Sequence, residues 1–499
     1  MRRILNKVDQ RHLRLLEILW GHGWKRITET AKILKVTERT LKKDIQVIND
    51  FIQPLYLETT DKAEIYLHTQ PEQGKSYVYA KILAKSWEFS LIEYSFLKDF
   101  SDLYDFCEMN FFSEETTRKR MRRLNMVLKE KGFSFDTSGH LIGSEHTLRN
   151  FMAQFMIEKY EHVFYVCDRK QMNLINELVD YFLLKNLPKI DASFFYYGEL
   201  NRLKMSIYLS IKRIQLGHYI AQKTVNEKKQ IDIVVEKNLA KKFEEQFHIP
   251  LTDNNIQDLF YLAIEQLQVS SFEDLLLVTE KSKKGQNLLN RLLDLIHELE
   301  EVFEIACTNK EQLLIKLYRV LSISGPYYII YDKIQDFFVG ISSECNFVVD
   351  FLEQKIEKQL LDGKNDSQLT HQIIFELLTS WNGLLEQIKS FMPKIRACLF
   401  LDSTKEHAEF LKDKLGHHLH PRFVFEIANV TMTENLIENA SNYDCILTNV
   451  SCLKLSNIPV ISISNYVNAA ELDLLLKFYE NNVTTWDKIS PESINNDHI

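Results

Sequence analysis

The feature of this sequence that most constrains its fold is a short break between two helical stretches near its beginning. Apolar residues at helical spacing predict a short helix over about residues 28–35, and Lys35-Val36 interrupts it. Thr37 then supplies an N-cap oxygen, Glu38 suits the positive end of a helix, and a second helix runs to about Ile52. A short helix, a tight turn and a second helix are typical of a helix-turn-helix, whose second helix enters the DNA major groove.

The second of these helices has an apolar face and a basic face. Leucine and isoleucine recur on the apolar face, at Leu41, Ile45, Ile48 and Ile52. The side chains that point away from this face are the candidate DNA contacts, namely Arg39, Thr40, Lys42, Lys43 and Gln46. The alternative is a plain three-helix bundle whose charged face is only solvated. Residues 56–67 favour DNA binding, because they alternate on both sides of Asp61-Lys62 and predict the β-hairpin of a winged helix.

The same order of elements recurs in the following stretch of chain. Helical patterns over residues 86–100 and 101–110 lead to a third helix, which Ser113 caps and Gly132 ends. Residues 133–144 then predict a second hairpin. The chain is therefore expected to begin with two winged helix-turn-helix domains in tandem.

Basic residues crowd the last helix of the second domain, where they fill five of the six positions from 118 to 123. Like charges this close repel one another, a cost that bound DNA phosphates would relieve. The candidate DNA contacts on the outer face of this helix are Arg118, Lys119, Arg122, Arg123 and Asn125. The alternative is a surface helix that is merely solvated.

The bulk composition narrows the class of protein. A chain of 499 residues should form several domains, and its formal charge of −8 contrasts with a basic amino-terminal end. The seven scattered cysteines include no C-x-x-C pair, so neither a zinc site nor a disulfide framework is indicated. We find no signal peptide and no apolar run long enough to span a bilayer. We therefore expect a cytoplasmic protein that uses no cofactor or metal and does not enter a membrane.

Long helical patterns dominate the body of the chain, beginning with a predicted amphipathic connecting helix over about residues 148–160, and give way to short β-type runs after Pro393. Two similar helical segments each carry a long helix with an arginine, Arg213 or Arg319, ahead of a glycine, which indicates an internal duplication. After Pro393, strands alternate with helices and predict a small parallel α/β domain. We thus expect a mainly α, multidomain chain with these parts: 1–70 and 71–147 winged helix-turn-helix, 148–283 and 284–392 helical, 393–490 α/β, and 491–499 a loose tail.

This order of parts resembles the Mga/AtxA family of transcriptional virulence regulators of Gram-positive bacteria. The resemblance covers nearly the whole chain and includes the stretches HLRLLEIL, VTERTLKKDI, LRNFMAQFMIEKY, RIQLGHYI and TNKEQLLIKLYRV. It implies that the two helical segments are regulatory domains (PRDs) of the sugar phosphotransferase system (PTS), in which histidines accept phosphate. It also implies that the last domain is similar to an EIIB component and contributes to a homodimer, and that the protein activates transcription.

Individual residues support only part of this regulation. The position expected to hold a phosphorylatable histidine ahead of Arg213 is Ser206, and residues 312–318 ahead of Arg319 contain no histidine. His371 and His218 are the remaining candidates for phosphorylation by the PTS phosphocarrier protein. In ordinary packing, each would instead be a hydrogen-bonded histidine without a regulatory role.

The EIIB-like domain also departs from an active phosphotransferase. The resemblance places the phosphoryl-accepting cysteine in the loop after the first strand, but that loop reads Asp402-Ser403-Thr404 and Cys398 lies within the strand. We therefore expect a scaffold and not an enzyme. The sequence predicts a dimeric regulator that binds double-stranded DNA. The alternatives are an RNA-binding antiterminator and a PTS phosphotransfer component.

Overall fold

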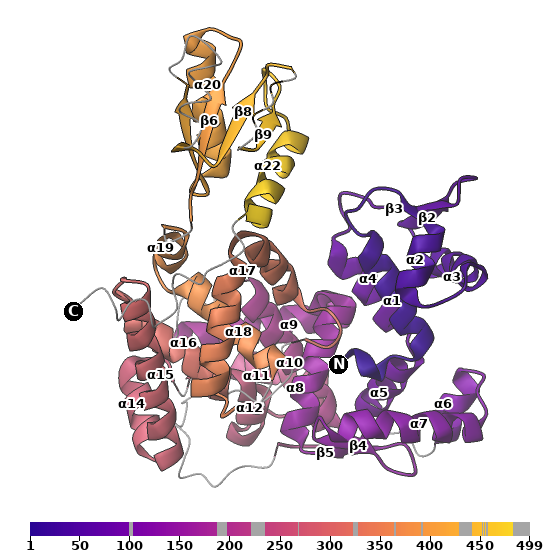
Figure 1. Ribbon diagram of the computed structural model, residues 1–499. Coiled ribbons are helices and arrows are strands. Elements are labelled where there is room, and N and C mark those ends of the chain that lie inside the picture. Colours follow the sequence, from indigo (N-terminus) through magenta and orange to yellow (C-terminus); the bar gives the residue numbers. More distant parts are fainter. Residues whose placement is uncertain are drawn as a thin grey trace. The chain divides into compact units, whose positions relative to one another are not determined.

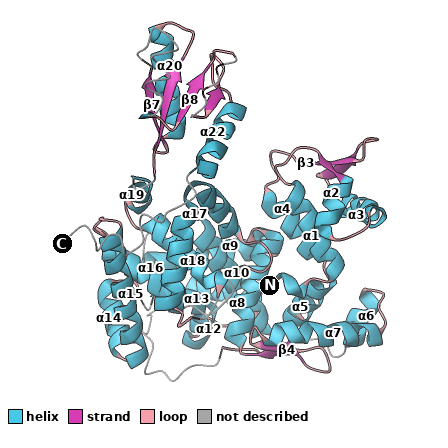
Figure 2. Cartoon of the chain, viewed as in Figure 1, coloured by secondary structure: helices cyan, strands magenta, loops and turns pink. Residues whose placement is uncertain are grey.

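The computed structural model is mainly helical, with a small sheet near the carboxyl end (Figures 1 and 2). It describes residues 1–98, 103–186, 197–220, 235–267, 269–322, 328–363, 366–390, 393–428, 442–451, 453, 455 and 458–482. The chain divides into two compact units. Unit 1 holds residues 1–292, 314–338 and 366–372, and unit 2 holds residues 293–313, 339–365 and 373–499.

The first 68 residues of unit 1 form a winged helix-turn-helix. Its elements are η1 (Arg2–Ile4), α1 (Lys7–Leu19), β1 (Lys25–Arg26), α2 (Ile27–Leu34), α3 (Glu38–Phe51), β2 (Tyr56–Thr59) and β3 (Glu64–His68). The strands form an antiparallel sheet in the order β1-β3-β2. The predicted helices and the predicted hairpin are therefore confirmed.

The break between α2 and α3 has a specific backbone cause. Lys35 adopts the left-handed conformation (φ 56°), and the Val36 N–H donates a hydrogen bond to the carbonyl oxygen of Ala31 at 3.0 Å. Together these end α2 as a glycine would at this position. Thr37 then caps α3, because its hydroxyl oxygen accepts the N–H of Thr40 at 3.2 Å.

A second winged helix-turn-helix follows. It consists of α4 (Lys75–Lys85), α5 (Trp87–Leu97), α6 (Leu103–Met109), α7 (Glu114–Lys129), β4 (Phe133–Phe135) and β5 (Leu141–Gly143). Gly132 ends the α7 turn with a φ of 84°, as its position in the sequence suggested. Gly143 pairs with Phe133 across the hairpin, and a Cβ there would lie 2.7 Å from the Phe133 Cβ, so only glycine fits.

Helix α8 (Glu145–Tyr160) lies in the interior of unit 1. The sequence suggested an amphipathic connecting helix from about residue 148. The structure corrects this, because α8 is buried on most sides and packs against both α4 and α10 (Tyr197–Gln215). Its polar residues Arg149 and Glu158 are buried as well, and their partners lie far along the chain.

The rest of unit 1 and the start of unit 2 are helical. The elements are η2 (Val163–Tyr165), α9 (Arg169–Asn186), α11 (Lys237–Phe247), α12 (Asp253–Leu259), α13 (Tyr261–Leu267), α14 (Phe272–Glu280), α15 (Lys283–Val302), α16 (Lys310–Ser322), α17 (Lys333–Gln359), α18 (Ser367–Ser380) and α19 (Leu384–Ser390). Within the ranges that the structure describes, no helix is long and apolar enough to cross a membrane.

Unit 2 ends in a small parallel α/β fold, as the alternating pattern predicted. Its elements are β6 (Ile395–Phe400), α20 (Lys405–Leu419), β7 (Phe423–Ile427), β8 (Cys445–Thr448), β9 (Val460–Ser462) and α22 (Ala469–Asn482). All strands run parallel in the order β7-β6-β8-β9. The predicted tail, 491–499, lies outside the described residues, and the six-part division of the chain stays a prediction.

Candidate nucleic-acid interface

Helices α3 and α7 are built on the same local plan. Each begins after a hydroxyl N-cap, Thr37 or Ser113, whose oxygen accepts the N–H three residues later. The hydroxyl of that third residue also bonds to the cap, at 2.9 Å for Thr40 and 2.8 Å for Thr116. Thr40, a candidate DNA contact, is therefore half-buried at the start of α3 and engaged with its own cap.

The basic residues predicted on α3 are accessible. Arg39, Lys42, Lys43 and Gln46 are all exposed, while Leu41 and Ile48 on the opposite face are fully buried. Asp44 is buried too, although the sequence pattern gave it no role. Among the residues that the structure describes, Arg39, Lys42 and Lys43 form no ion pair, so their charges remain available to an anionic partner.

The basic face of α7 divides into available and engaged side chains. Lys119, Arg122 and Arg123 are exposed and form no ion pair within the described part of the chain. Arg118 is only half-exposed: it pairs with Glu114 and donates a hydrogen bond to the carbonyl oxygen of Thr137 in the hairpin turn. Arg118 therefore holds the wing and is not a free cation.

Asn125 does not lie on the outer stripe where the sequence placed it. Its amide nitrogen donates to the carbonyl oxygen of Phe135 at 2.8 Å, and its amide oxygen accepts the Phe135 N–H at 2.7 Å. Asn49 on α3 bonds the backbone of Leu57 in the same way, at 2.9 and 2.7 Å. An amide suits this role because it matches both a backbone donor and a backbone acceptor. Asn49 and Asn125 lie at the same distance along the chain from the N-caps of their helices, and this shared spacing is the sequence signal that could have indicated their common role.

A buried charge cluster fixes α3 against α1. Both oxygens of Asp44 accept from Arg11, at 2.6 and 2.9 Å, and the ring of His12 lies 3.1 Å from Asp44 Oδ1. Burial raises the pKa of Asp44, but its bonds to Arg11 and His12 outweigh burial and lower the pKa overall. Burial and the nearby Lys85 ammonium lower the pKa of His12. Helix α3 is thus anchored to α1 by an ionised carboxylate.

A second buried charge cluster joins α8 to α10. Arg213 donates to the two oxygens of Glu145 at 2.7 and 2.9 Å, and the fully buried Arg149 donates to Glu145 at 3.0 Å and to Asp258. Burial raises the pKa of Glu145, but the two guanidinium groups outweigh burial and lower it. Arg213, singled out in the sequence as a repeat marker, therefore holds the core of unit 1.

The two candidate phosphorylation histidines lie on different elements. His371 is half-buried at the fifth position of α18, where its ring stacks on Phe338 with centroids 4.4 Å apart. His218 is exposed just beyond α10, and its carbonyl oxygen accepts from Arg149 at 3.0 Å. Phosphorylation of either histidine stays a prediction.

The start of the α/β fold holds the residues that the sequence compares with those of an active phosphotransferase. Cys398 lies within β6 and is fully buried, and burial raises the pKa of its thiol to about 11. In the following loop, Thr404 caps α20, and the Asp402 N–H donates to Asn449 at 2.7 Å. Over the described ranges of the chain, no three His, Cys, Asp or Glu side chains are placed to hold a metal ion.

Two consecutive units of helices and a hairpin, each with an exposed basic helix, are arranged as in DNA-binding regulators. Residues 71–156 match the family of Mga helix-turn-helix domains. The chain is 22% identical over 493 residues to a candidate trans-acting regulator of Streptococcus pneumoniae, covering 95% of this chain and 98% of that protein. It is 20% identical to the capsule synthesis positive regulator AcpA of Bacillus anthracis, over 43% of this chain and 44% of AcpA. These matches support a transcriptional regulator similar to the Mga/AtxA family.

Proposed function

We propose that the protein binds double-stranded DNA through α3 and α7. The contacting side chains are exposed on the outer faces of these helices: Arg39, Lys42, Lys43, Gln46, Lys119, Arg122 and Arg123. The six cations among them have no ion-pair partner in the part of the chain that the structure describes. Their charges can therefore replace the counterions of DNA phosphates, which drives association at moderate salt.

This surface favours contacts to the DNA backbone over the reading of bases. Asparagine and glutamine are suited to reading adenine, but Asn49 and Asn125 are committed to the wings and only Gln46 remains exposed on α3. Lysine and arginine bind phosphates of any sequence. We therefore propose recognition based largely on DNA shape, with each base change in a bound site costing no more than about 3 kcal/mol. Competition with mutated duplexes measures this cost.

We further propose that the protein acts as a homodimer held by its α/β domain. The support is the resemblance to regulators with an EIIB-like end and the fold of residues 393–482, which contains no cysteine in its first loop. Two linked DNA-binding ends bind adjacent half-sites more tightly than one. Light scattering of the full-length chain at micromolar concentration should give twice the mass of one chain, whereas a single-chain mass would contradict the proposal.

We propose that the protein activates transcription and that the PTS regulates it. AcpA is named a positive regulator, and the helical segments 148–283 and 284–392 are the proposed PTS regulatory domains. His371 and His218 are the proposed phosphate acceptors. Incubation with the phosphocarrier, the PTS enzyme that phosphorylates it and labelled phosphoenolpyruvate should label the wild-type chain. The double variant His371→Ala/His218→Ala should not be labelled, and equal labelling of both proteins would refute these two positions.

Binding of nucleic acids separates the leading proposal from its alternatives. An antiterminator would bind single-stranded RNA, and a phosphotransfer component would need neither nucleic acid. Gel shifts should show salt-sensitive binding to duplex DNA that an equal mass of single-stranded RNA does not displace. Displacement by RNA at equal concentration would favour the antiterminator. The phosphocarrier experiment would favour a phosphotransfer component if label passed onward from this chain to an added acceptor.

A further inference from the structure

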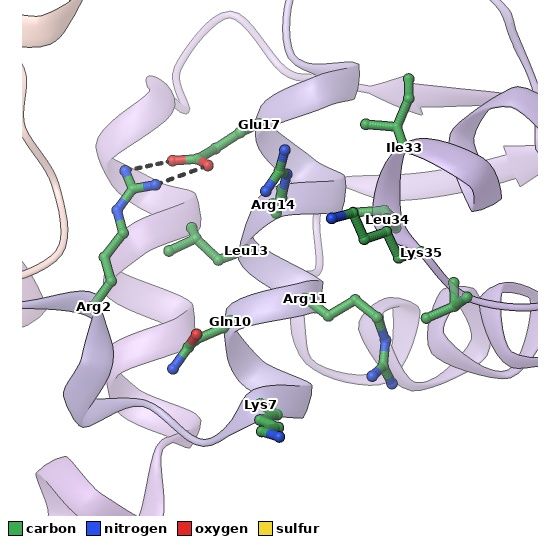
Figure 3. Close-up of a pocket in the computed structure, with 11 residues that line it drawn as sticks. Arg2, Lys7, Gln10, Arg11, Leu13, Arg14, Glu17, Ile33, Leu34 and Lys35 are labelled. Carbon is green, nitrogen blue, oxygen red and sulfur yellow. Dashed lines mark hydrogen bonds and ion pairs between the residues drawn. The ribbon is translucent and has the colours of Figure 1, made fainter.

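The first winged unit contains a concave pocket that the proposed DNA-binding face does not include. The pocket has a volume of about 600 Å³ and lies between α1 and the end of α2 (Figure 3). Its wall continues onto Lys35 and Val36 in the turn before α3, but none of the proposed α3 contacts lines it. A group bound in this pocket would therefore make contacts additional to those of α3 and α7.

Positive charge dominates the lining of the pocket. Its charged side chains are Arg2, Lys7, Arg11, Arg14, Lys35 and a single carboxylate, Glu17. Arg2 pairs with Glu17 at 2.6 Å, and Arg11 pairs with the buried Asp44. The remaining three cations are Lys7, Arg14 and Lys35. In the described residues none of them forms an ion pair, which leaves three uncompensated positive charges on one concave surface. A concave wall concentrates their field and attracts an anion.

The backbone at Lys35 adds an independent observation. Lys35 is left-handed, with φ 56° and ψ 44°, at the position where helices usually end in glycine. A side chain with a Cβ is strained in this conformation. The lysine that occupies this strained position lines the pocket, and its side chain extends back toward α1 (Figure 3). Strain of this kind is more often retained at functional sites than elsewhere.

The remaining walls suit a small organic molecule as well as an inorganic ion. Leu13 is fully buried, and Leu34 and Val36 are half-buried at the lining, beside the exposed Ile33. Pockets that hold small ligands have volumes of roughly 300–1,000 Å³, with apolar walls and a few convergent polar groups. The two guanidinium groups of Arg2 and Arg11 are held in place by carboxylates and form a preorganised rim.

We propose that this pocket binds a phosphate group through Lys7, Arg14 and Lys35. Phosphate fits because its several anionic oxygens accept charge-assisted hydrogen bonds from ammonium and guanidinium groups at once. The phosphate can belong to a small organic phosphate or to the backbone of bound DNA, and only the second source rests on the proposed DNA-binding function. In both cases the bound phosphate would contact the turn that positions α3, because Lys35 and Val36 of this turn line the pocket.

Titration of the full-length protein with inorganic phosphate and, separately, with glucose 6-phosphate tests the free-ligand source. Calorimetry should show saturable binding to the wild type and at least a tenfold loss in Lys35→Gly and in Arg14→Ala. Lys35→Gly is informative because glycine relieves the left-handed strain, so the variant keeps its fold while it loses the ammonium group. The control is Lys32→Ala, an exposed lysine of α2 outside the pocket, which should bind as the wild type does.

Binding to a non-specific duplex tests the DNA source. If DNA supplies the phosphate, free phosphate does not saturate, but Lys35→Gly lowers the slope of log K against log salt by about one. Lys32→Ala leaves that slope unchanged. The proposal is overturned if neither titration responds to Lys35→Gly and Arg14→Ala, or if Lys32→Ala has the same effect as these variants. A chain that binds no DNA would refute the proposed function, while the free-phosphate titration alone would still decide this pocket.

Discussion

Replacement of Asn125 by alanine should loosen the second wing without removing any charge from α7. The two hydrogen bonds of Asn125 to the backbone of Phe135 are short, at 2.8 and 2.7 Å, and the side chain is half-buried. The loss of each contributes about 0.5–1.5 kcal/mol, so the pair should cost about 1–3 kcal/mol. The cost should fall on the β4–β5 hairpin, because Phe135 lies at its turn end.

Hydrogen exchange is the suitable assay, since a chain with two compact units does not unfold in one step. A loss of 1–3 kcal/mol in local opening should raise the exchange rate of residues 133–143 by about 5- to 150-fold. Asn125→Asp should also loosen the hairpin, because it keeps an acceptor for the Phe135 N–H but places a carboxylate against the carbonyl oxygen.

The matched control for this prediction is Met126→Ala, the next residue of α7, whose side chain is 65% exposed. It should leave exchange in residues 133–143 unchanged. Equal exchange in Asn125→Ala and the wild type would refute the assignment of Asn125 as a wing clamp. A large effect of Met126→Ala would show that the wing responds to any truncation of this helix.

Other predictions concern the buried groups. Arg213→Met leaves Glu145 with one partner fewer in the core and should lower the opening free energy of α8 and α10, measured by hydrogen exchange, by about 3–5 kcal/mol. The pKa of Glu145 is below its ordinary 4.5, so its contribution to stability is present above pH 4.5 and is lost as the pH falls through the lowered value. The variant Glu145→Gln should therefore lose less stability than the wild type when the pH falls below 4.5. Burial raises the pKa of Cys398 to about 11 and that of Cys445 to about 12, so iodoacetamide at pH 8 should modify neither before urea is added, and rapid native alkylation would contradict their burial.

Local patterns in the sequence were sufficient to predict most of the elements. The caps at Thr37 and Ser113, the turn at Gly132 and the alternating strands after Pro393 each depend on residues close in sequence. These features were predictable because capping and pleating involve only a few neighbouring residues.

Long-range pairing was not predictable in the same way. Glu158 on α8 accepts the backbone N–H groups of Ile329, Ile330 and Tyr331 at 2.6, 2.9 and 3.1 Å. A glutamate is expected at a helix surface, and no local signal shows that its partners lie far along the chain. The burial of α8 therefore became evident only in three dimensions.

The candidate interface shows the same division. The exposure of Lys42, Lys43 and Arg122 follows from helical spacing, because their positions lie opposite the apolar face. The hydrogen bonds of Asn125 and Arg118 require the hairpin to pack against α7, and helical spacing alone does not predict this packing. The pocket beside Lys35 likewise requires the packing of α1 against the end of α2.

The salt dependence of DNA affinity tests the central claim most directly, namely that α3 and α7 bind the duplex. Each phosphate contact contributes about 0.9 to the slope of log K against log salt. The double variants Lys42→Ala/Lys43→Ala and Arg122→Ala/Arg123→Ala should each lower the slope by about two, and their combination by about four. The control Lys283→Ala/Lys284→Ala removes the same charge from exposed positions of α15 and should keep the wild-type slope. A folded combined variant with the wild-type affinity and slope would contradict the account.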